Sequence, residues 1–313
     1  MGNLYPSDRQ IMSPIALLLV TISTFSHALW NYLGKKSNPS PAFFEMTLLA
    51  ATVCLSPILF FYIGKISYIP IQVWGMLLLT GVCQSVYFWG LAGAYRHGQL
   101  SIAYPLARAL PVLIVTIISL LFKLGNPISS MGYAGIFLVV MGCLLIPLQT
   151  FGSIKLRSYL NLYCGLAFIA ACGTAGYTII DNEALRVLRS LPDMGLNSVE
   201  IAILYMFFET AITATVLGFY ILVSPADRRL FMEIQARGWR FAAVTGVIIN
   251  LTYGLVLAAM AFVTNVSYLA AFRELSIPIG AVLGISLQKE PGYRPKIVGV
   301  GIVLAGLLLV GFS

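Results

Sequence analysis

The chain has 313 residues, of which 59% are hydrophobic and only 10% charged, and its net charge is +8. Soluble domains carry about 25% charged residues, so a soluble fold this apolar would have too little polar surface. Apolar runs recur along the whole length, which predicts a polytopic membrane protein. The Lys and Arg residues fall mostly in short loops, where they set topology and meet anionic headgroups rather than nucleic acid.

Ten apolar segments are long enough to cross a bilayer as helices. In chain order they are roughly 12–34, 41–63, 71–95, 99–122, 128–148, 159–181, 197–222, 239–261, 264–287 and 294–312. Helices are the expected element because lipid offers no hydrogen-bond partners to the backbone, and the alternation typical of a membrane barrel is absent. The expected fold is therefore an all-α polytopic membrane protein with ten transmembrane helices.

An internal repeat divides these segments into two halves. Four residues of the first half recur in order after a constant offset: Tyr104, Pro127, Gly135 and Gly142 return as Tyr268, Pro291, Gly299 and Gly306. Five helices per copy is an odd number, so the second copy enters the bilayer from the opposite side. The expectation is two inverted five-helix repeats, with a substrate site near the midplane between them. The predicted domains are a tail (1–11), a first repeat (12–148), a linker (149–158) and a second repeat (159–313).

The motif "SHALWN" (26–31) closes the first segment, and prolines in segments four and nine precede "KLGNP" (123–127) and "QKEP" (288–291). Together with the five-plus-five repeat, these features resemble the drug/metabolite transporter superfamily, EamA type. The resemblance implies a secondary transporter, commonly an exporter, in the bacterial inner membrane with both termini in the cytosol. The loops after segments four and nine lack the Gly-Glu pair usual in such families.

Polar side chains near the end of the first segment share one helical face. His27, Trp30 and Asn31 are spaced by three and four residues, so the sequence favours a cavity-facing stripe. An interfacial role is the alternative, because aromatic rings favour the headgroup region.

Two arginines lie deep in apolar segments, Arg108 near Tyr104 and Arg273 near Tyr268. Charges at this depth cost about 2.5–3.5 kcal/mol each and are therefore expected to face the protein interior. The sequence also predicts that Pro105 and Pro111 in segment four, and Pro278 in segment nine, break the helical backbone nearby.

Each arginine has two readings. One is a structural ion pair with Glu274, Glu209 or Glu45; the other is a fork for a carboxylate or phosphate of the substrate. Neighbouring helical residues point about 100° apart, so Arg273 and Glu274 cannot both face one partner.

Further stripes of tyrosine and amide side chains occur in segments three, six and eight, and such a lining suits a small organic solute. The predicted substrate-binding residues are His27, Trp30, Asn31, Tyr87, Tyr104, Arg108, Tyr177, Tyr253, Tyr268 and Arg273. Glu45, Glu209 and Glu274 are candidate proton carriers for coupling. Asp181 and Glu200 lie nearer the predicted segment ends, where water is expected to reach them.

No enzyme signature is present, since HExxH, P-loop and GxSxG patterns are absent and the five cysteines form no CxxC pair. We expect no catalysis, metal or cofactor. The expected function is transport of a small polar or amphipathic metabolite. The two arginines favour anions, whereas cationic or neutral amphiphiles are favoured if Glu45 or Glu209 faces the cavity. A lipid-binding scaffold is a third reading, in which the polar groups pair off without a cavity.

The expected partners are the bilayer, a small-molecule substrate and protons as a candidate coupling ion, with no nucleic acid; monomer and homodimer both stay open. Orientation also stays open. Lys and Arg are more numerous in the loops opposite the N-terminus, which favours both termini outside. The family resemblance implies the reverse.

Overall fold

The computed structural model describes residues 12–34, 40–97, 100–146, 148–153, 162–287 and 291–312, and for 29–34, 95, 97, 100–106, 153, 283–284 and 287 the backbone alone. Across these residues the chain is helical, and the described part contains no strand beyond a single β-bridge between Met12 and Val263. The predicted all-α fold is confirmed.

The helices, in chain order, correspond closely to the predicted segments. They are α1 (Pro14–Gly34), α2 (Pro41–Leu55), α3 (Ile58–Tyr62), α4 (Ile71–His97), α5 (Leu100–Leu121), α6 (Ser130–Leu145), α7 (Leu162–Arg189), α8 (Ser198–Val223), α9 (Pro225–Arg237), α10 (Trp239–Ala259), α11 (Val266–Arg273), α12 (Ser276–Leu287) and α13 (Arg294–Phe312). Short 3-10 turns include η1 (Ile63–Tyr68), η4 (Pro192–Met194) and η5 (Met260–Phe262).

Among the described residues, 5 helices are long and apolar enough to cross a membrane, or 6 if the bent α2–α3 pair forms one span. The five are α4, α7, α8, α10 and α13, and the α2–α3 pair bends by 49°. Shorter apolar helices lie within α1, α5 and α6. These helices make the chain an integral membrane protein, while the count of ten spans stays a prediction.

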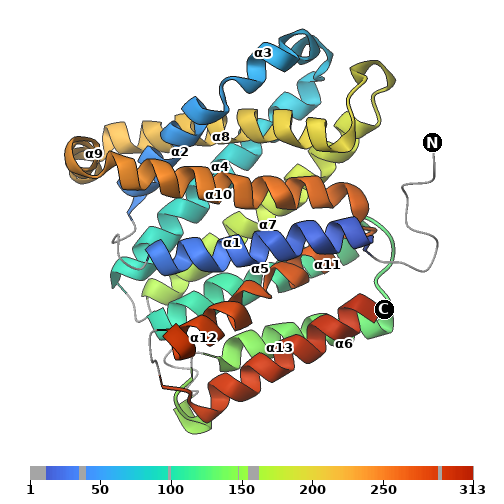
Figure 1. Ribbon diagram of the computed structural model, residues 1–313, viewed down its shortest axis with the longest axis vertical. Helices are drawn as coiled ribbons and strands as arrows, with labels where there is room; N and C mark the ends of the chain where they lie inside the picture. The colour runs from blue at the N-terminus through green and yellow to red at the C-terminus, as the bar shows by residue number, and fades with distance from the viewer. Residues whose placement is uncertain are drawn as a thin grey trace.

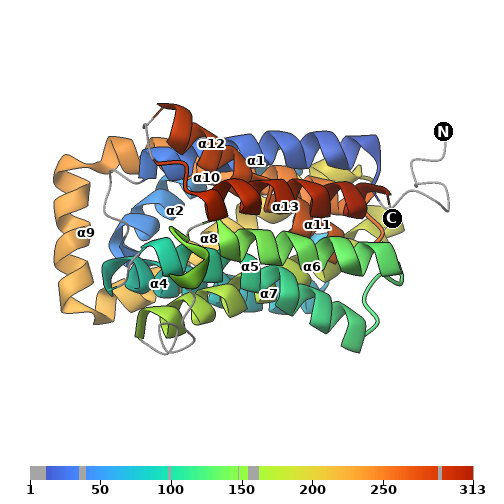
Figure 2. The same ribbon diagram turned by 90° about the horizontal axis from the view of Figure 1, so that it is seen from below.

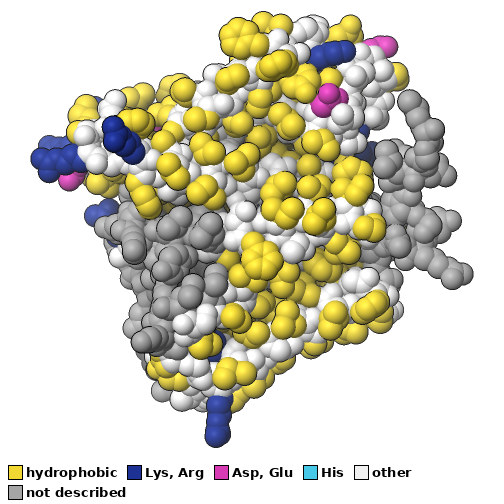
Figure 3. All heavy atoms as spheres, in the orientation of Figure 1, with side chains coloured by type: hydrophobic (Ala, Val, Ile, Leu, Met, Phe, Trp, Pro, Cys, Tyr) yellow, Lys and Arg dark blue, Asp and Glu magenta, His cyan; other side chains and the backbone are white. Residues whose placement is uncertain are grey.

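α1, α8 and α10 lie side by side with nearly parallel axes, and α4 runs at a steep angle to them (Figure 1). The first turn of α1 and the last turn of α13 lie at one end of the bundle, and α9 lies across the opposite end (Figure 2). Hydrophobic side chains cover most of the visible flank, and Lys and Arg stand mainly at its edges (Figure 3). Such a surface suits lipid along the flank and headgroups at the two ends.

Helix pairs join the two predicted halves in a reciprocal pattern. α4 packs against α7, and α10 packs against α1. α6 crosses α13 antiparallel, with glycines at the contact: a Cβ on Gly135 would lie 2.7 Å from the Gly306 carbonyl oxygen, and a Cβ on Gly306 would lie 2.7 Å from the Gly135 oxygen. Gly142 and Gly299 approach each other in the same way. The offset of the repeat carries Gly135 to Gly299 and Gly142 to Gly306, so it exchanges these two contacts. A pseudo-two-fold axis through the crossing requires this exchange, which supports the inverted repeat.

The helix breaks only partly match the prediction. Segment nine does break, at Glu274 and Leu275 between α11 and α12, and Pro278 follows in the first turn of α12, where a missing backbone N–H costs little. Segment four does not: α5 runs on from Leu100 to Leu121 through Pro105 and Pro111. Each of these prolines removes one hydrogen bond, but neighbouring turns keep the α5 backbone helical.

Two further differences concern the ends of elements. α7 continues to Arg189, well past the predicted end at residue 181. α9 is not among the predicted helices, because a polar sequence of this kind is typical of a loop. Ser224 caps it by accepting a hydrogen bond from the Asp227 backbone N–H, and Pro225 occupies its first position.

Candidate functional site

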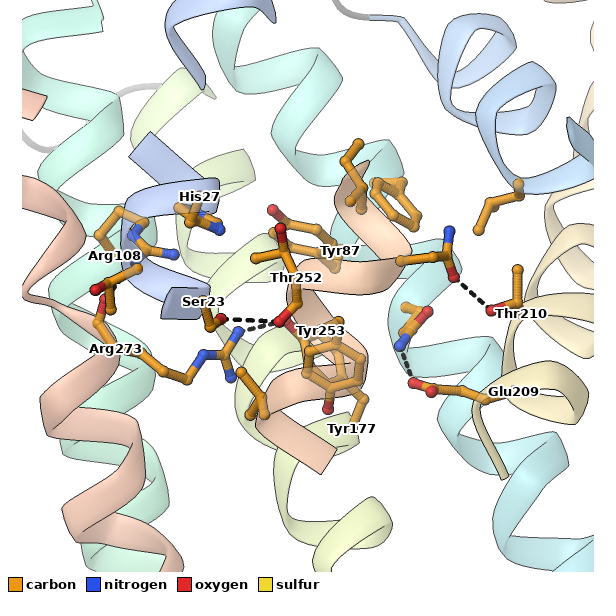
Figure 4. A pocket seen from close by; sticks show the side chains of 17 residues that line it. Ser23, His27, Tyr87, Arg108, Tyr177, Glu209, Thr210, Thr252, Tyr253 and Arg273 are labelled. Atoms are coloured by element: carbon orange, nitrogen blue, oxygen red, sulfur yellow. Dashed lines mark hydrogen bonds between the residues drawn. The ribbon is translucent and has the colours of Figure 1, made fainter. Parts of the chain in front are cut away.

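A cavity of about 70 Å³ lies in the middle of the bundle, and helices of both predicted halves form its wall (Figure 4). Its lining residues are Ser23, Thr24, His27, Leu48, Gln84, Tyr87, Phe88, Arg108, Tyr177, Glu209, Thr210, Ile249, Asn250, Thr252, Tyr253, Val256 and Arg273. A second cavity of about 40 Å³ shares His27, Tyr87, Arg108, Tyr177 and Arg273 with it. The polar stripes predicted on separate helices therefore converge on one region.

Most of the predicted substrate-binding residues lie at these cavities. His27, Tyr87, Arg108, Tyr177, Tyr253 and Arg273 line the first, together with the proton-carrier candidate Glu209. Glu274 lines the second. The side chains of Trp30, Asn31 and Tyr104 lie outside the described residues.

Two of the predicted residues have other surroundings. Tyr268 is 2% exposed, and its hydroxyl accepts a hydrogen bond from the Ser129 backbone N–H at 3.1 Å, so it fastens α11 to the start of α6. Glu45 is 4% exposed and packs against Gly218 of α8. Neither is among the residues that line the two cavities.

Arg108 is held by groups at the break between α11 and α12. Its Nε lies 3.4 Å from Oε2 of Glu274. One terminal nitrogen donates to the Ser276 hydroxyl at 2.8 Å and to the Arg273 carbonyl oxygen at 3.3 Å. That carbonyl is accessible because the helix ends there. Arg108 therefore forms the structural ion pair with Glu274 that the sequence predicts as one of its two roles.

Arg273 has different neighbours. Its guanidinium carbon lies 5.4 Å from the centroid of the Tyr253 ring, and its terminal nitrogens donate to the Tyr177 hydroxyl at 3.5 Å and the Thr178 hydroxyl at 3.4 Å. Within the described part of the chain, no carboxylate lies within 4.0 Å of it. Rings and hydroxyls stabilise a cation only partly, so the Arg273 charge remains available to an anion.

The opposite wall of the cavity is acidic (Figure 4). Glu209 is 1% exposed, and its Oε1 accepts a hydrogen bond from the Gln84 side-chain amide. Beside it, Asp181 is fully buried and accepts hydrogen bonds from the hydroxyls of Thr80 (2.6 Å), Tyr205 (2.8 Å) and Tyr253 (2.6 Å). The expectation that water reaches Asp181 was wrong, because α7 extends two turns past the predicted segment end and places Asp181 inside the bundle. Glu200, by contrast, caps the start of α8 at the surface.

Several polar residues at the cavities are not among the predicted substrate-binding residues, although Ser23 and Asn250 lie on the polar stripes of the first and eighth segments. Thr210 donates to the Asn250 side-chain oxygen, and Ser23 donates to the Thr252 carbonyl oxygen at 2.8 Å. Thr174 lines the second cavity with a buried hydroxyl that has no hydrogen-bond partner among the described residues. The only sequence signal for Thr174 was its place three residues before Tyr177, on the same face of α7.

The chain resembles known proteins both in sequence and in fold. Residues 14–148 match the model of the EamA-like transporter family, and this range ends where the first predicted repeat ends. A crystal structure of a protein with 13% sequence identity aligns over 94% of this chain and 95% of its own, with a TM-score of 0.64, which shows a shared fold. No curated protein matches the chain in sequence. The predicted resemblance is thus confirmed over the first half of the chain, and the match to the EamA-like transporter family indicates a membrane transporter.

Proposed function

We propose that this protein is a secondary transporter of a small organic anion, whose carboxylate, phosphate or phosphonate group binds Arg273 in the central cavity. The observation that carries this proposal is the difference between the two arginines. Glu274 neutralises Arg108, whereas Arg273 faces the cavity and, among the described residues, contacts rings and hydroxyls but no carboxylate. A cation in this setting gains from an anionic ligand that can accept two N–H bonds.

The size of the cavity supports transport by alternating access. About 70 Å³ admits an anionic headgroup or a few water molecules, whereas small-molecule sites usually measure roughly 300–1,000 Å³. A whole metabolite therefore needs the two halves to move apart on one side, as in alternating access around a midplane site. Export from the cytosol across a bacterial inner membrane is the direction and place that the family resemblance implies.

The proposal is tested by a ligand thermal-shift screen on detergent-purified protein with amino acids, phosphonates, sugar phosphates and organic amines. A ligand at 100 times its Kd stabilises the folded protein by about 2.7 kcal/mol, which a melting curve resolves. We expect hits among the anions, and loss of those shifts in Arg273→Gln. Uptake and efflux in proteoliposomes with the hit compound then give the direction.

Arg186→Gln is the matched control, because this arginine is exposed and pairs with Glu183 on the bundle surface. Its anion shifts should equal those of the wild type. Anion shifts that survive Arg273→Gln would refute the role of Arg273.

A second candidate is transport of an organic amine, favoured by Glu209 in the cavity wall. The same screen separates the two candidates: an amine transporter would respond to amines, lose the response in Glu209→Gln and keep it in Arg273→Gln. The lipid-binding scaffold finds less support, since its polar groups should pair off without a cavity, and here they surround one.

A further inference from the structure

We propose that Asp181 and Glu209 form a proton-binding site coupled to the cavity, so that one proton crosses the membrane with each anion that Arg273 binds. This inference rests on the proposed anion transport and adds its coupling ion. It joins Glu209, a wall residue of the cavity, to Asp181, which lies behind the wall and was not a predicted site residue.

The two carboxyl groups lie on neighbouring helices, α7 and α8. Tyr205, one turn before Glu209 on α8, donates its hydroxyl to Asp181 of α7, which brings the two carboxyl groups together. Two carboxylates this close repel each other unless one of them carries a proton. The three hydroxyls that donate to Asp181 stabilise its ionised form, which assigns the shared proton to Glu209. At rest, the pair therefore carries one negative charge.

The charges around the empty cavity balance one another. Arg108 and Glu274 cancel each other. His27 shares both cavities with the two arginines and is expected to be uncharged, because a third cation there would be costly. The single charge of the Asp181–Glu209 pair cancels that of Arg273, so the empty site is neutral. An entering anion adds a negative charge in a medium where uncompensated charge is costly. Binding of a second proton by the carboxyl pair restores neutrality, and water on the side from which the anion enters supplies that proton.

Tyr253 connects the carboxyl pair with the anion site at Arg273. Its hydroxyl donates to Oδ2 of Asp181 at 2.6 Å, and Arg273 lies over its ring. Figure 4 shows Tyr253 and Tyr177 between the arginines on one side and Glu209 on the other. Asp181 and Arg273 thus contact one tyrosine, so a change of charge at either is felt at the other.

Other ionisable groups around the pair are few. On the helices packed against α7 and α8 they are Cys83 on α4, Arg108 on α5, Tyr253 on α10 and Arg273 on α11, with Tyr177 and Tyr205 on α7 and α8 themselves. Glu45 on α2 and Asp227 on α9 lie farther along α8, against Gly218 and Tyr220. Among the described residues, neither arginine forms an ion pair with Asp181 or Glu209. The two carboxyl groups and their shared proton therefore act as one unit.

The shared proton is tested without any ligand, by infrared spectroscopy of the purified protein in lipid. A protonated carboxyl group has a C=O band distinct from those of a carboxylate. We expect this band near neutral pH in the wild type and a loss of part of its intensity in Glu209→Gln. Glu45→Gln is the matched control, since Glu45 is also a buried glutamate on a helix of the bundle but does not line the cavity, and it should keep the Glu209 band.

The coupling is tested with methanesulfonate, an anion whose own charge does not change with pH. Its apparent affinity, from thermal shifts between about pH 6 and pH 8, should fall about tenfold per pH unit if one proton enters with each anion. In the Asp181→Asn/Glu209→Gln double variant, which cannot take up the second proton, this dependence should vanish.

The outcomes separate this inference from the anion site. If methanesulfonate does not bind the wild type at any pH, both the proposed anion site and the proposed coupling are refuted. If it binds with an affinity that does not change with pH, the anion site stands and the coupling is overturned. If Glu209→Gln leaves the intensity of the carboxyl band unchanged, Glu209 carries no proton and the proposed pair is wrong.

Discussion

The two cavity arginines look alike in the sequence, since Arg108 lies three residues and Arg273 five residues from a proline, yet their surroundings differ at the scale of single residues. Arg108 forms an ion pair with Glu274, because α11 ends there and the turn directs the Glu274 side chain toward α5. Arg273, one residue earlier, points about 100° away around the helix and meets Tyr177 and Tyr253 instead. One guanidinium is therefore a structural element, and the other is available to a ligand.

The ion pair between Arg108 and Glu274 should be costly to break from one side. Their side chains are 13% and 5% exposed, so Arg108→Gln leaves a buried carboxylate without its cation. We expect a loss of about 3–5 kcal/mol in the free energy of unfolding, visible as a lower melting temperature. The double variant Arg108→Gln/Glu274→Gln removes both charges and should recover most of the loss. Equal melting temperatures for the single and double variants would contradict an ion pair.

The sequence predicted which types of residue line the site better than it predicted how deeply each side chain is buried in the bundle. His27, Tyr87, Tyr177 and Tyr253 lie at the cavity because helical spacing alone decides which side chains share a face. Asp181 shares that face with Tyr177 but was assigned to water, since burial depends on where a helix ends and what packs over it. Pairing is equally invisible in the sequence, because the choice of Glu274 rather than Glu209 for Arg108 depends on the turn after α11.

At the scale of elements, the crossing of α6 and α13 depends on glycines at the contact. A Cβ on Gly306 would lie 2.7 Å from the Gly135 oxygen and 2.8 Å from the Val139 nitrogen, both backbone atoms that cannot move alone. Gly306→Ala should therefore destabilise the protein by about 1–3 kcal/mol, as overpacking does, and lower its melting temperature.

Gly301 on the same helix is the matched control for that substitution. It is exposed, and a Cβ placed there would have no atom within 4 Å. Gly301→Ala should leave the melting temperature unchanged or raise it slightly, because alanine favours helix more than glycine does. A similar loss in both variants would mean that helix propensity, not the crossing, sets the effect.

Two asparagines cap helices in different settings, which gives a second prediction at this scale. Asn197 is exposed and caps α8 through the backbone N–H groups of Val199 and Glu200. Asn265 is 4% exposed; besides capping α11, its amide donates to the carbonyl oxygens of Leu124 and Asn126 at 3.0 and 2.9 Å.

Asn197→Ala should cost about 0.5–2 kcal/mol, the usual loss of an N-cap. Asn265→Ala should cost more, because the carbonyl groups of Leu124 and Asn126 also lose their donor, at about 1–3 kcal/mol for each group that water does not then satisfy. Melting temperatures of the two variants, measured side by side, test the order. Equal losses would mean that water satisfies the two carbonyl groups after the substitution.

Hydrophobic runs predicted the membrane helices well, because burial in lipid requires an apolar surface nearly all round a helix. They could not predict α9, whose polar sequence gives no such run, although Ser224, Pro225 and Gly238 mark both of its ends. They also placed the end of α7 too early, since a helix that leaves the lipid can continue on capping and packing alone.

At the scale of the whole molecule, the two ends of the bundle carry different charges. Arg228, Arg229 and Arg237 of α9 and Arg240 of α10 gather at one end. The other end holds the start of α1, where the Ser13 N–H donates to the Phe262 carbonyl oxygen, and the end of α7, where Arg189 donates to the Leu257 carbonyl oxygen. The positive-inside rule therefore predicts that the end richer in arginine, and with it α9, faces the cytosol.

This orientation is testable with single cysteines at the two ends. Asp193→Cys in η4 and Arg237→Cys in α9 are both at exposed positions, and the first lies at the end where α1 begins. In intact cells, a membrane-impermeant maleimide should label Asp193→Cys, whereas Arg237→Cys should react only after the membrane is opened. The wild type is the blank for the native cysteines. The reverse labelling would place both termini in the cytosol, as the family resemblance implies, and would show that the arginines of α9 do not decide the topology.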